Sequence, residues 1–131
     1  MFIHLETQNN SLYERVGREA FFASLVDHFY RGVESDPILR PLYPDELEPP
    51  RRHLTLFLIQ YWGGPHTYSD ERGHPRLRMR HVRFRIGDAE REAWLHHMRA
   101  AVAQSGASTA DAQALMNYFE TAATSLLNAP H

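Results

Sequence analysis

Residues 57–65 read FLIQYWGGP, and residues 73–81 read GHPRLRMRH. The first stretch closes an apolar helical pattern, because two glycines followed by a proline stop a helix abruptly. The second is a short basic segment that ends in His81, one helical turn after the apolar Leu77. A neutral imidazole is a good ligand for metal ions, iron among them. A lone histidine among nine is more often a surface or capping residue, so a metal-binding role for His81 needs support from the rest of the chain.

Helical periodicity runs along the whole chain. Apolar residues recur at helical spacing over residues 22–33, 54–61, 94–102 and 112–127. The second of these stripes consists of Leu54, Phe57, Leu58 and Tyr61. No alternating strand pattern of useful length and no internal repeat occurs. The sequence therefore predicts an all-α fold.

The residues between the stripes mark helix ends. Asp88 is a plausible N-cap for the third helix, and Ser108 or Thr109 for the fourth. Prolines separate the first and second stripes, where a first helical turn tolerates them because its N–H groups have no partner within the helix. Residues 65–87 form a long connection in which we expect only a short helical segment, over residues 77–81. A loop of this length in a small domain is usually functional or disordered.

Composition limits the classes of function. The 131 residues suit one compact domain, and 43% of them are hydrophobic. The absence of cysteine excludes disulfides, thiolate catalysis and cysteine-based metal sites. No apolar run is long enough to span a membrane, and the N-terminus lacks the features of a signal peptide. We therefore expect a cytoplasmic protein without a membrane anchor.

Six blocks of the sequence, in their order along the chain, resemble the group II truncated haemoglobins. They are Phe29-Tyr30, Tyr43-Pro44, residues 57–65, residues 73–81, Phe84-Arg85-Ile86 and Trp94. The resemblance covers nearly the entire chain and implies a two-over-two helical sandwich enclosing a haem, with the first two stripes paired and the last two paired. Residues 1–131 would form a single globin domain, with residues 1–10 as a flexible N-terminal extension.

The resemblance also implies the cofactor and its ligand. The cofactor would be haem b, and His81 would bind its iron. Apolar contacts with the haem are expected from Leu54, Phe57, Leu77, Phe84 and Ile86. The two haem carboxylates need cationic partners, for which Arg80 and Arg76 are candidates, with Tyr68 as a hydroxyl donor.

Three aromatic residues are implied on the distal side, around the ligand on iron. They are Tyr30, Tyr43 and Trp94. Bound dioxygen carries partial negative charge, so O–H and indole N–H donors would form charge-assisted hydrogen bonds with it. Losing one such bond in a dry pocket costs about 1–3 kcal/mol, which is roughly ten- to a hundredfold in dissociation. The alternative is that each aromatic simply packs in the core.

Several polar residues have competing interpretations. Pro50 stands where many globins carry a distal histidine, so His53 is either that ligand or, as we favour, a residue at the pocket rim. The six arginines of residues 72–85 resemble a nucleic-acid strip, but the net charge of −2 and the lack of interleaved exposed aromatics argue against nucleic-acid binding. His96 and His97 are adjacent on a helix, so they point in different directions and are expected at its surface.

Three classes of function follow. The first is a haem protein that binds dioxygen and other diatomic ligands at a five-coordinate iron and releases them slowly. The second is a redox enzyme, a nitric oxide dioxygenase or a peroxidase, which would need an electron-donating reductase because the chain carries no flavin or nicotinamide motif. The third is a haem carrier or a haem-free helical interaction module. The sequence does not indicate an oligomeric state.

Overall fold

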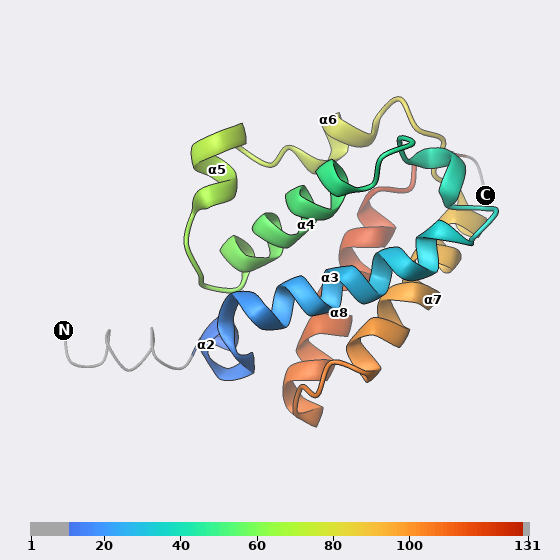
Figure 1. The fold of residues 1–131 in the computed structure, drawn as a ribbon. Coiled ribbons are helices and arrows are strands. Elements are labelled where there is room, and N and C mark those ends of the chain that lie inside the picture. The colour runs from blue at the N-terminus through green and yellow to red at the C-terminus, as the bar shows by residue number, and fades with distance from the viewer. Residues whose placement is uncertain (1–10, 130–131) are drawn as a thin grey trace.

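The computed structural model describes residues 11–129, and the predicted extension over residues 1–10 lies outside them (Figure 1). The regular elements are α2 (Leu12–Val16), α3 (Arg18–Glu34), the 3-10 turn η1 (Arg40–Leu42), α4 (Glu48–Tyr61), α5 (Thr67–Arg72), α6 (Leu77–His81), α7 (Asp88–Ala103) and α8 (Thr109–Ser125). No strand occurs in the described part of the chain, so the predicted all-α fold is confirmed. None of its helices is long and apolar enough to cross a membrane.

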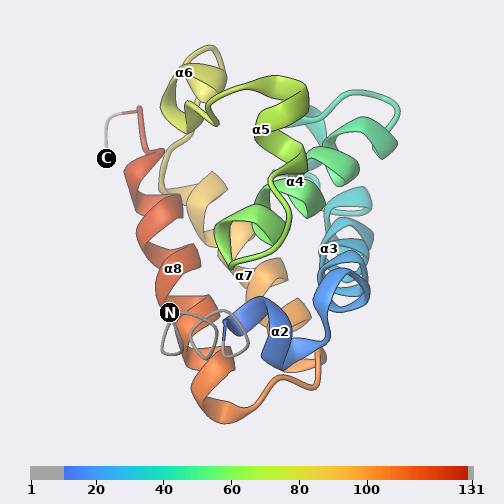
Figure 2. The same cartoon turned by 90° about the vertical axis from the view of Figure 1, so that its left-hand side faces the viewer.

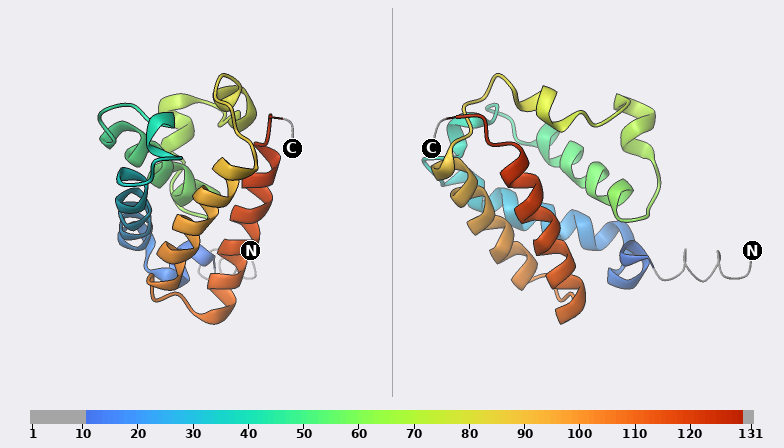
Figure 3. Two further views of the ribbon diagram at one scale, coloured as in Figure 1. Left: turned by 90° about the vertical axis from the view of Figure 1, so that its right-hand side faces the viewer. Right: turned by 180° about the vertical axis from the view of Figure 1, so that it is seen from behind.

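Two antiparallel pairs of helices lie across each other. Helix α3 packs against α4, α7 packs against α8, and α3 also contacts α7 (Figures 1 and 2). Seen from behind, α7 and α8 cross the direction of the other pair, while α5 and α6 lie beyond α4 (Figure 3). This is the two-over-two sandwich that the resemblance implied.

Helix α3 supplies much of the core. Its apolar stripe is fully covered because it faces both α4 and α7. The stripe residues Phe22, Leu25, Val26, Phe29 and Val33 are at most 1% exposed. Gly32 on the same helix lies against α7, where an added Cβ would stand 2.2 Å from Nδ1 of His97. The two layers therefore approach closely at this position.

The glycine pair after α4 has a packing role as well as a helix-breaking one. Helix α4 ends at Tyr61, as predicted. A Cβ on Gly64 would stand 2.7 Å from both the Tyr13 ring and the Ile59 side chain. The Tyr13 N–H donates a hydrogen bond of 3.1 Å to the carbonyl of Trp62. The turn is thus pressed against α2.

The N-cap of α8 agrees with the prediction, and the N-cap of α7 differs from it. The Ser108 hydroxyl accepts a hydrogen bond from the Asp111 N–H at the start of α8, as expected of an N-cap. The prediction that Asp88 caps α7 is wrong, because the helix begins at Asp88 and Gly87 is the N-cap. The Gly87 N–H donates instead to Glu90 Oε1 at 2.7 Å. Asp88 still places a negative charge in the first turn, where the helix dipole favours it.

The connection over residues 65–87 holds one more helix than predicted. Helix α6 occupies the expected residues, but α5 was not foreseen. Helix α5 is fixed to α4 through Gln60, whose amide donates to the Ser69 hydroxyl at 2.7 Å and accepts from the Ser69 N–H at 2.9 Å. Tyr68 is buried on its inner side. These tertiary contacts keep the six residues of α5 helical. The segment is polar and has no apolar periodicity from which a helix could be predicted.

Candidate functional site

A cavity of about 490 Å³ opens among the helices. Its volume falls in the range of cofactor sites, and apolar side chains make up most of its wall. Of the thirteen residues that the sequence proposed for the site, all but Arg76 line it. The twelve are Tyr30, Tyr43, His53, Leu54, Phe57, Tyr68, Leu77, Arg80, His81, Phe84, Ile86 and Trp94. The structure therefore brings together side chains from α3, α4, α5, α6, α7 and the connecting segments.

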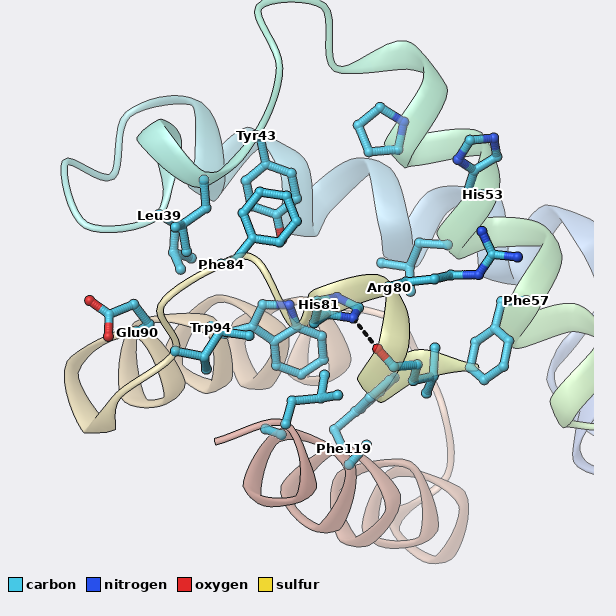
Figure 4. Close-up of a pocket in the computed structure, with 18 of the residues that line it drawn as sticks. Leu39, Tyr43, His53, Phe57, Arg80, His81, Phe84, Glu90, Trp94 and Phe119 are labelled. Atoms are coloured by element: carbon cyan, nitrogen blue, oxygen red, sulfur yellow. Dashed lines mark hydrogen bonds between the residues drawn. The ribbon is translucent and has the colours of Figure 1, made fainter. Parts of the chain in front are cut away.

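His81 is the last residue of α6, and its ring is held by its own helix. Nδ1 lies 2.6 Å from the carbonyl oxygen of Leu77 (Figure 4). A carbonyl only accepts hydrogen bonds, so Nδ1 carries the proton and Nε2 keeps a free lone pair. Such a bond at the second nitrogen is the usual way that a metal-binding histidine is oriented. Among residues 11–129 no cluster of three or more histidine, aspartate or glutamate side chains that could hold a metal ion forms.

The three predicted aromatic donors meet one another. The Tyr30 and Tyr43 rings contact edge to face, with 5.5 Å between centroids. Burial raises the pKa of Tyr43 to about 12, while hydrogen bonds from Trp94 and Tyr30 act in the opposite direction. Burial also raises the pKa of Tyr30, as do its proximity and its hydrogen bond to Tyr43. An indole N–H can only donate, so between Trp94 and Tyr43 the tyrosine oxygen is the acceptor.

The segment that carries Tyr43 is fixed by Arg40, a residue that the sequence did not single out. The Arg40 guanidinium donates to the carbonyls of Tyr43 at 3.3 Å, Pro44 at 3.0 Å and Asp45 at 2.9 Å. A planar guanidinium has five donors in a rigid arrangement, which suits a curved row of carbonyls. Tyr43 is therefore held in place although it lies outside any helix.

Asp36 ties the same segment to α7. Its carboxylate accepts from the Ile38 and Leu39 N–H groups at 2.8 and 3.2 Å, and it pairs with His97 Nε2 at 2.6 Å. The expectation that His97 is an ordinary surface residue is wrong, because its side chain is only 19% exposed. It joins α7 to the segment between α3 and α4 through its pair with Asp36. His96 is exposed, as expected.

The open side of the cavity is cationic. Arg80 donates to the carbonyls of Pro75 and Arg72, and its guanidinium lies 6.0 Å from the Tyr68 ring centroid. Arg72 donates to His53 Nε2 at 3.0 Å, so His53 is neutral with its proton on Nδ1. Burial and the nearby charge of Arg72 lower the pKa of His53. Arg76 does not line the cavity, whereas Arg72 does.

Sequence reasoning missed one wall of the cavity. Helix α8 contributes Tyr118, Phe119, Ala122 and Ala123, and its C-cap residue Leu126 follows them. These residues belong to the fourth apolar stripe, and a stripe alone does not distinguish a core contact from a cavity wall. The adjacent alanines are the available signal, because small side chains leave space against a neighbouring helix. Glu90 and Arg91 also line the cavity from the first turn of α7.

These features fit the iron porphyrin that the resemblance implied. His81 offers one nitrogen lone pair, and the walls are largely apolar. Neither Arg72 nor Arg80 forms an ion pair with a carboxylate among residues 11–129, whereas the neighbouring Arg52 is paired with Glu71. Two carboxylates of a bound group would therefore meet two arginines that have no anionic partner in the described chain.

Comparison with known proteins also indicates a globin. Residues 11–128 match the family model of the bacterial-like globins. The chain is 39% identical over 119 residues to the group 2 truncated hemoglobin YjbI of Bacillus subtilis, which covers 91% of this chain and 89% of that protein.

Solved structures of other haemoglobins are similar to this chain as well. A thermostable hemoglobin from the actinobacterium Thermobifida fusca has a TM-score of 0.90 at 51% identity, over 92% of this chain and 99% of that one. A truncated oxygen-avid haemoglobin from Bacillus subtilis has a TM-score of 0.86 at 39% identity, over 91% and 100% of the two chains. The chain therefore belongs to the bacterial-like globin family, as a group II truncated haemoglobin with a haem cofactor.

Proposed function

We propose that this protein binds dioxygen and other diatomic ligands at a five-coordinate haem b held by His81, and that it releases them slowly. The observation that carries the proposal is that Tyr30, Tyr43 and Trp94, three aromatic side chains with O–H or N–H groups, all line the cavity. The solved Bacillus subtilis relative is described as oxygen-avid, which supports the same assignment.

The haem supplies an iron atom at which a diatomic gas is held, and the chain supplies everything that selects and retains that gas. Tyr43 lines the cavity, and its O–H can donate a hydrogen bond to a ligand held there. A hydroxyl oriented in advance by its neighbours loses little freedom when it binds a partly anionic ligand. Slow release is the expected consequence.

The arginines at the open side would hold the haem carboxylates. The Arg72 and Arg80 guanidinium groups lie 5.9 and 6.0 Å from the Tyr68 ring centroid, so both are near the same part of the cavity wall. The neutral His53 accepts a hydrogen bond from Arg72 and adds no further positive charge. Leu54, Phe57, Leu77, Phe84 and Ile86 would contact the apolar part of the ring.

Replacing Tyr43 tests the proposal. Tyr43→Phe removes the donor, so dioxygen should leave roughly ten- to a hundredfold faster in stopped-flow displacement. Tyr13→Phe is the matched control, since Tyr13 is also a buried tyrosine but does not line the cavity. Equal release rates in the two variants would contradict the proposal, and the absence of a Soret band in the purified protein would remove its basis.

A redox activity at the same haem, as a peroxidase, is the second candidate. Tyr118 of the cavity wall stacks on Tyr61, whose side chain is 51% exposed. The stack connects the cavity to the protein surface through oxidisable rings. A nitric oxide dioxygenase would share the cavity, and either enzyme would take electrons from a reductase or a small donor.

A further inference from the structure

The outer side of α6 presents two large apolar side chains to solvent. Met79 is 68% exposed and Val82 is 70% exposed, more than any other large hydrophobic side chain of residues 11–129. The two residues are three positions apart, and Val82 continues the helical backbone with φ −60° and ψ −30°, so both lie on one helical face. Helix α6 itself lies at the edge of the fold (Figures 1 and 2).

The inner side of the same segment faces the cavity. Four of its residues line the cavity wall, namely Leu77, Arg80, His81 and Phe84. They recur every three or four residues, which is the spacing of one helical face. Figure 4 shows His81, Arg80 and Phe84 around the cavity. Helix α6 is therefore a wall of a single helix, with the proposed iron ligand on one side and Met79 and Val82 on the other.

The charges around this apolar pair are all positive. Seven of the fourteen arginines pair with a carboxylate, namely Arg15, Arg18, Arg31, Arg51, Arg52, Arg91 and Arg99. Six of the other seven lie within residues 72–85, a stretch without aspartate or glutamate. The carboxylates of a bound haem would meet Arg72 and Arg80. The remaining four are exposed and form no ion pair in the described part of the chain, namely Arg76, Arg78, Arg83 and Arg85.

Two of these arginines are held beside the apolar pair. Arg78 and Arg83 are each four residues from a member of the pair, about one helical turn. Arg78 Nε donates to the Ser125 carbonyl at 3.3 Å, and the Arg83 guanidinium lies 5.9 Å from the Phe84 ring centroid. These contacts orient the two side chains, whose charge stays open to solvent. We call the exposed side chains of this segment the α6 face, which consists of Arg76, Arg78, Met79, Val82, Arg83 and Arg85.

The composition of the α6 face fits a protein partner with an acidic surface. Methionine and arginine are enriched at protein interfaces, which combine an apolar centre with a polar rim. A positive surface attracts and orients a negative one. A nucleic acid binds through its phosphates and through bases stacked on aromatic rings, so it would leave the exposed Met79 and Val82 unused.

We propose that the α6 face docks an acidic electron-carrier protein that reduces the haem iron. The proposal rests on the haem held by His81 in the proposed function. The reduced carrier gives up one electron and is oxidised, and ferric iron takes up that electron and becomes ferrous, without transfer of a proton. The chain has no flavin or nicotinamide motif of its own, so the electron has to come from another molecule. A carrier docked on α6 is separated from the iron ligand by the width of one helix.

A plant-type two-iron ferredoxin, an acidic one-electron carrier, is the probe. Titration calorimetry measures how the oxidised ferredoxin binds to the ferric haem-loaded protein, and stopped-flow mixing under carbon monoxide measures reduction by reduced ferredoxin. Both should weaken as salt is added, because the charges are exposed. Arg78→Gln with Arg83→Gln should lower the affinity and the reduction rate roughly tenfold or more. Val82→Asp should do the same, while dioxygen release stays at the wild-type rate in both variants.

Arg18→Gln with Arg99→Gln is the matched control, since it removes two positive charges from exposed arginines of α3 and α7. This variant should bind ferredoxin as the wild type does. An equal loss in the two double variants would overturn the α6 face, because net charge alone would then explain the binding. Tighter binding of duplex DNA than of ferredoxin would overturn it as well. A stable dioxygen complex without ferredoxin binding would overturn the α6 face and leave the proposed function intact, whereas failure to bind haem would overturn both.

Discussion

Tyr43 lies beside Tyr30 and Trp94 and has an O–H of its own to give. At the scale of single residues, this makes Trp94 a residue that acts through Tyr43. The Trp94 ring is also packed against Phe29 and Phe119, so Trp94→Phe keeps most of the packing while it removes the N–H. The hydroxyl of Tyr43 would then be less firmly oriented toward a ligand.

A double-mutant cycle distinguishes this indirect role from direct contact with the ligand. Trp94→Phe alone should speed dioxygen release by about fivefold, the equivalent of about 1 kcal/mol for one hydrogen bond. In a Tyr43→Phe background the same change should have almost no further effect, because the acceptor of the Trp94 N–H is gone. Additive effects in stopped-flow displacement would show instead that Trp94 donates to the ligand itself. Trp62→Phe, which changes a tryptophan outside the cavity wall, is the control.

At the scale of elements, the segment between α3 and α4 depends on one arginine. Arg40→Ala removes three hydrogen bonds to the carbonyls of residues 43–45. We expect a loss of about 1–3 kcal/mol in the free energy of unfolding, because carbonyls of the segment lose their donor. Dioxygen release should become faster, since Tyr43 loses its fixed position. Urea denaturation and release kinetics measure the two effects.

Arg31→Ala is the matched control for that prediction. Arg31 is an exposed arginine whose guanidinium pairs with Asp27 one helical turn away. Pairs of this kind contribute about 0.3–0.5 kcal/mol. If Arg40→Ala and Arg31→Ala behaved alike in both measurements, Arg40 would have no special role in positioning Tyr43.

Prediction from sequence succeeded where a local pattern determined the structure. The apolar stripes located the four long helices, and α6 was located by the segment that ends in His81. Helix α5 was not predicted, because its position depends on the hydrogen bond between Gln60 and Ser69, which forms only in the folded chain. The helix start at Gly87 depended on a single hydrogen bond that the Gly87 N–H donates to the Glu90 side chain.

The same distinction holds for the site. Residues carried over from the family resemblance all reached the cavity, whereas the wall from α8 and the choice of Arg72 over Arg76 did not follow from any local pattern. Arg76, the N-cap of α6, has a left-handed backbone with a φ of 46°. That conformation is uncommon for a non-glycine residue, and no pattern in the sequence indicated it.

At the scale of the whole molecule, the Asp36–His97 pair joins the two helix pairs. Burial acts to raise the pKa of Asp36, but the hydrogen bonds from His97 and from the Ile38 and Leu39 N–H groups outweigh it, so the pKa is lowered. A carboxyl whose pKa is lower in the folded than in the unfolded state stabilises the fold above its unfolded pKa, about 3.9. This stabilisation is lost as the pH falls through the folded value.

Asp36→Asn should therefore lower the free energy of unfolding at neutral pH, and the difference from the wild type should shrink below about pH 4. Urea denaturation over a series of pH values measures it. Asp45→Asn, a change in an exposed aspartate of the same segment, serves as the control. A difference between wild type and Asp36→Asn that is the same at every pH would show that the ionised carboxylate does not stabilise the fold.

Gly32 lets α3 approach α7 until the His97 ring occupies the place where a Cβ would stand. The imidazole is thus a spacer between the two layers as well as a partner of Asp36. Aliphatic packing adjusts gradually, but a flat ring between two helices has a fixed thickness. A thinner or thicker side chain at position 97 would shift one layer against the other. The shape of the cavity, and with it the range of ligands admitted, would change although no residue of its wall had been replaced.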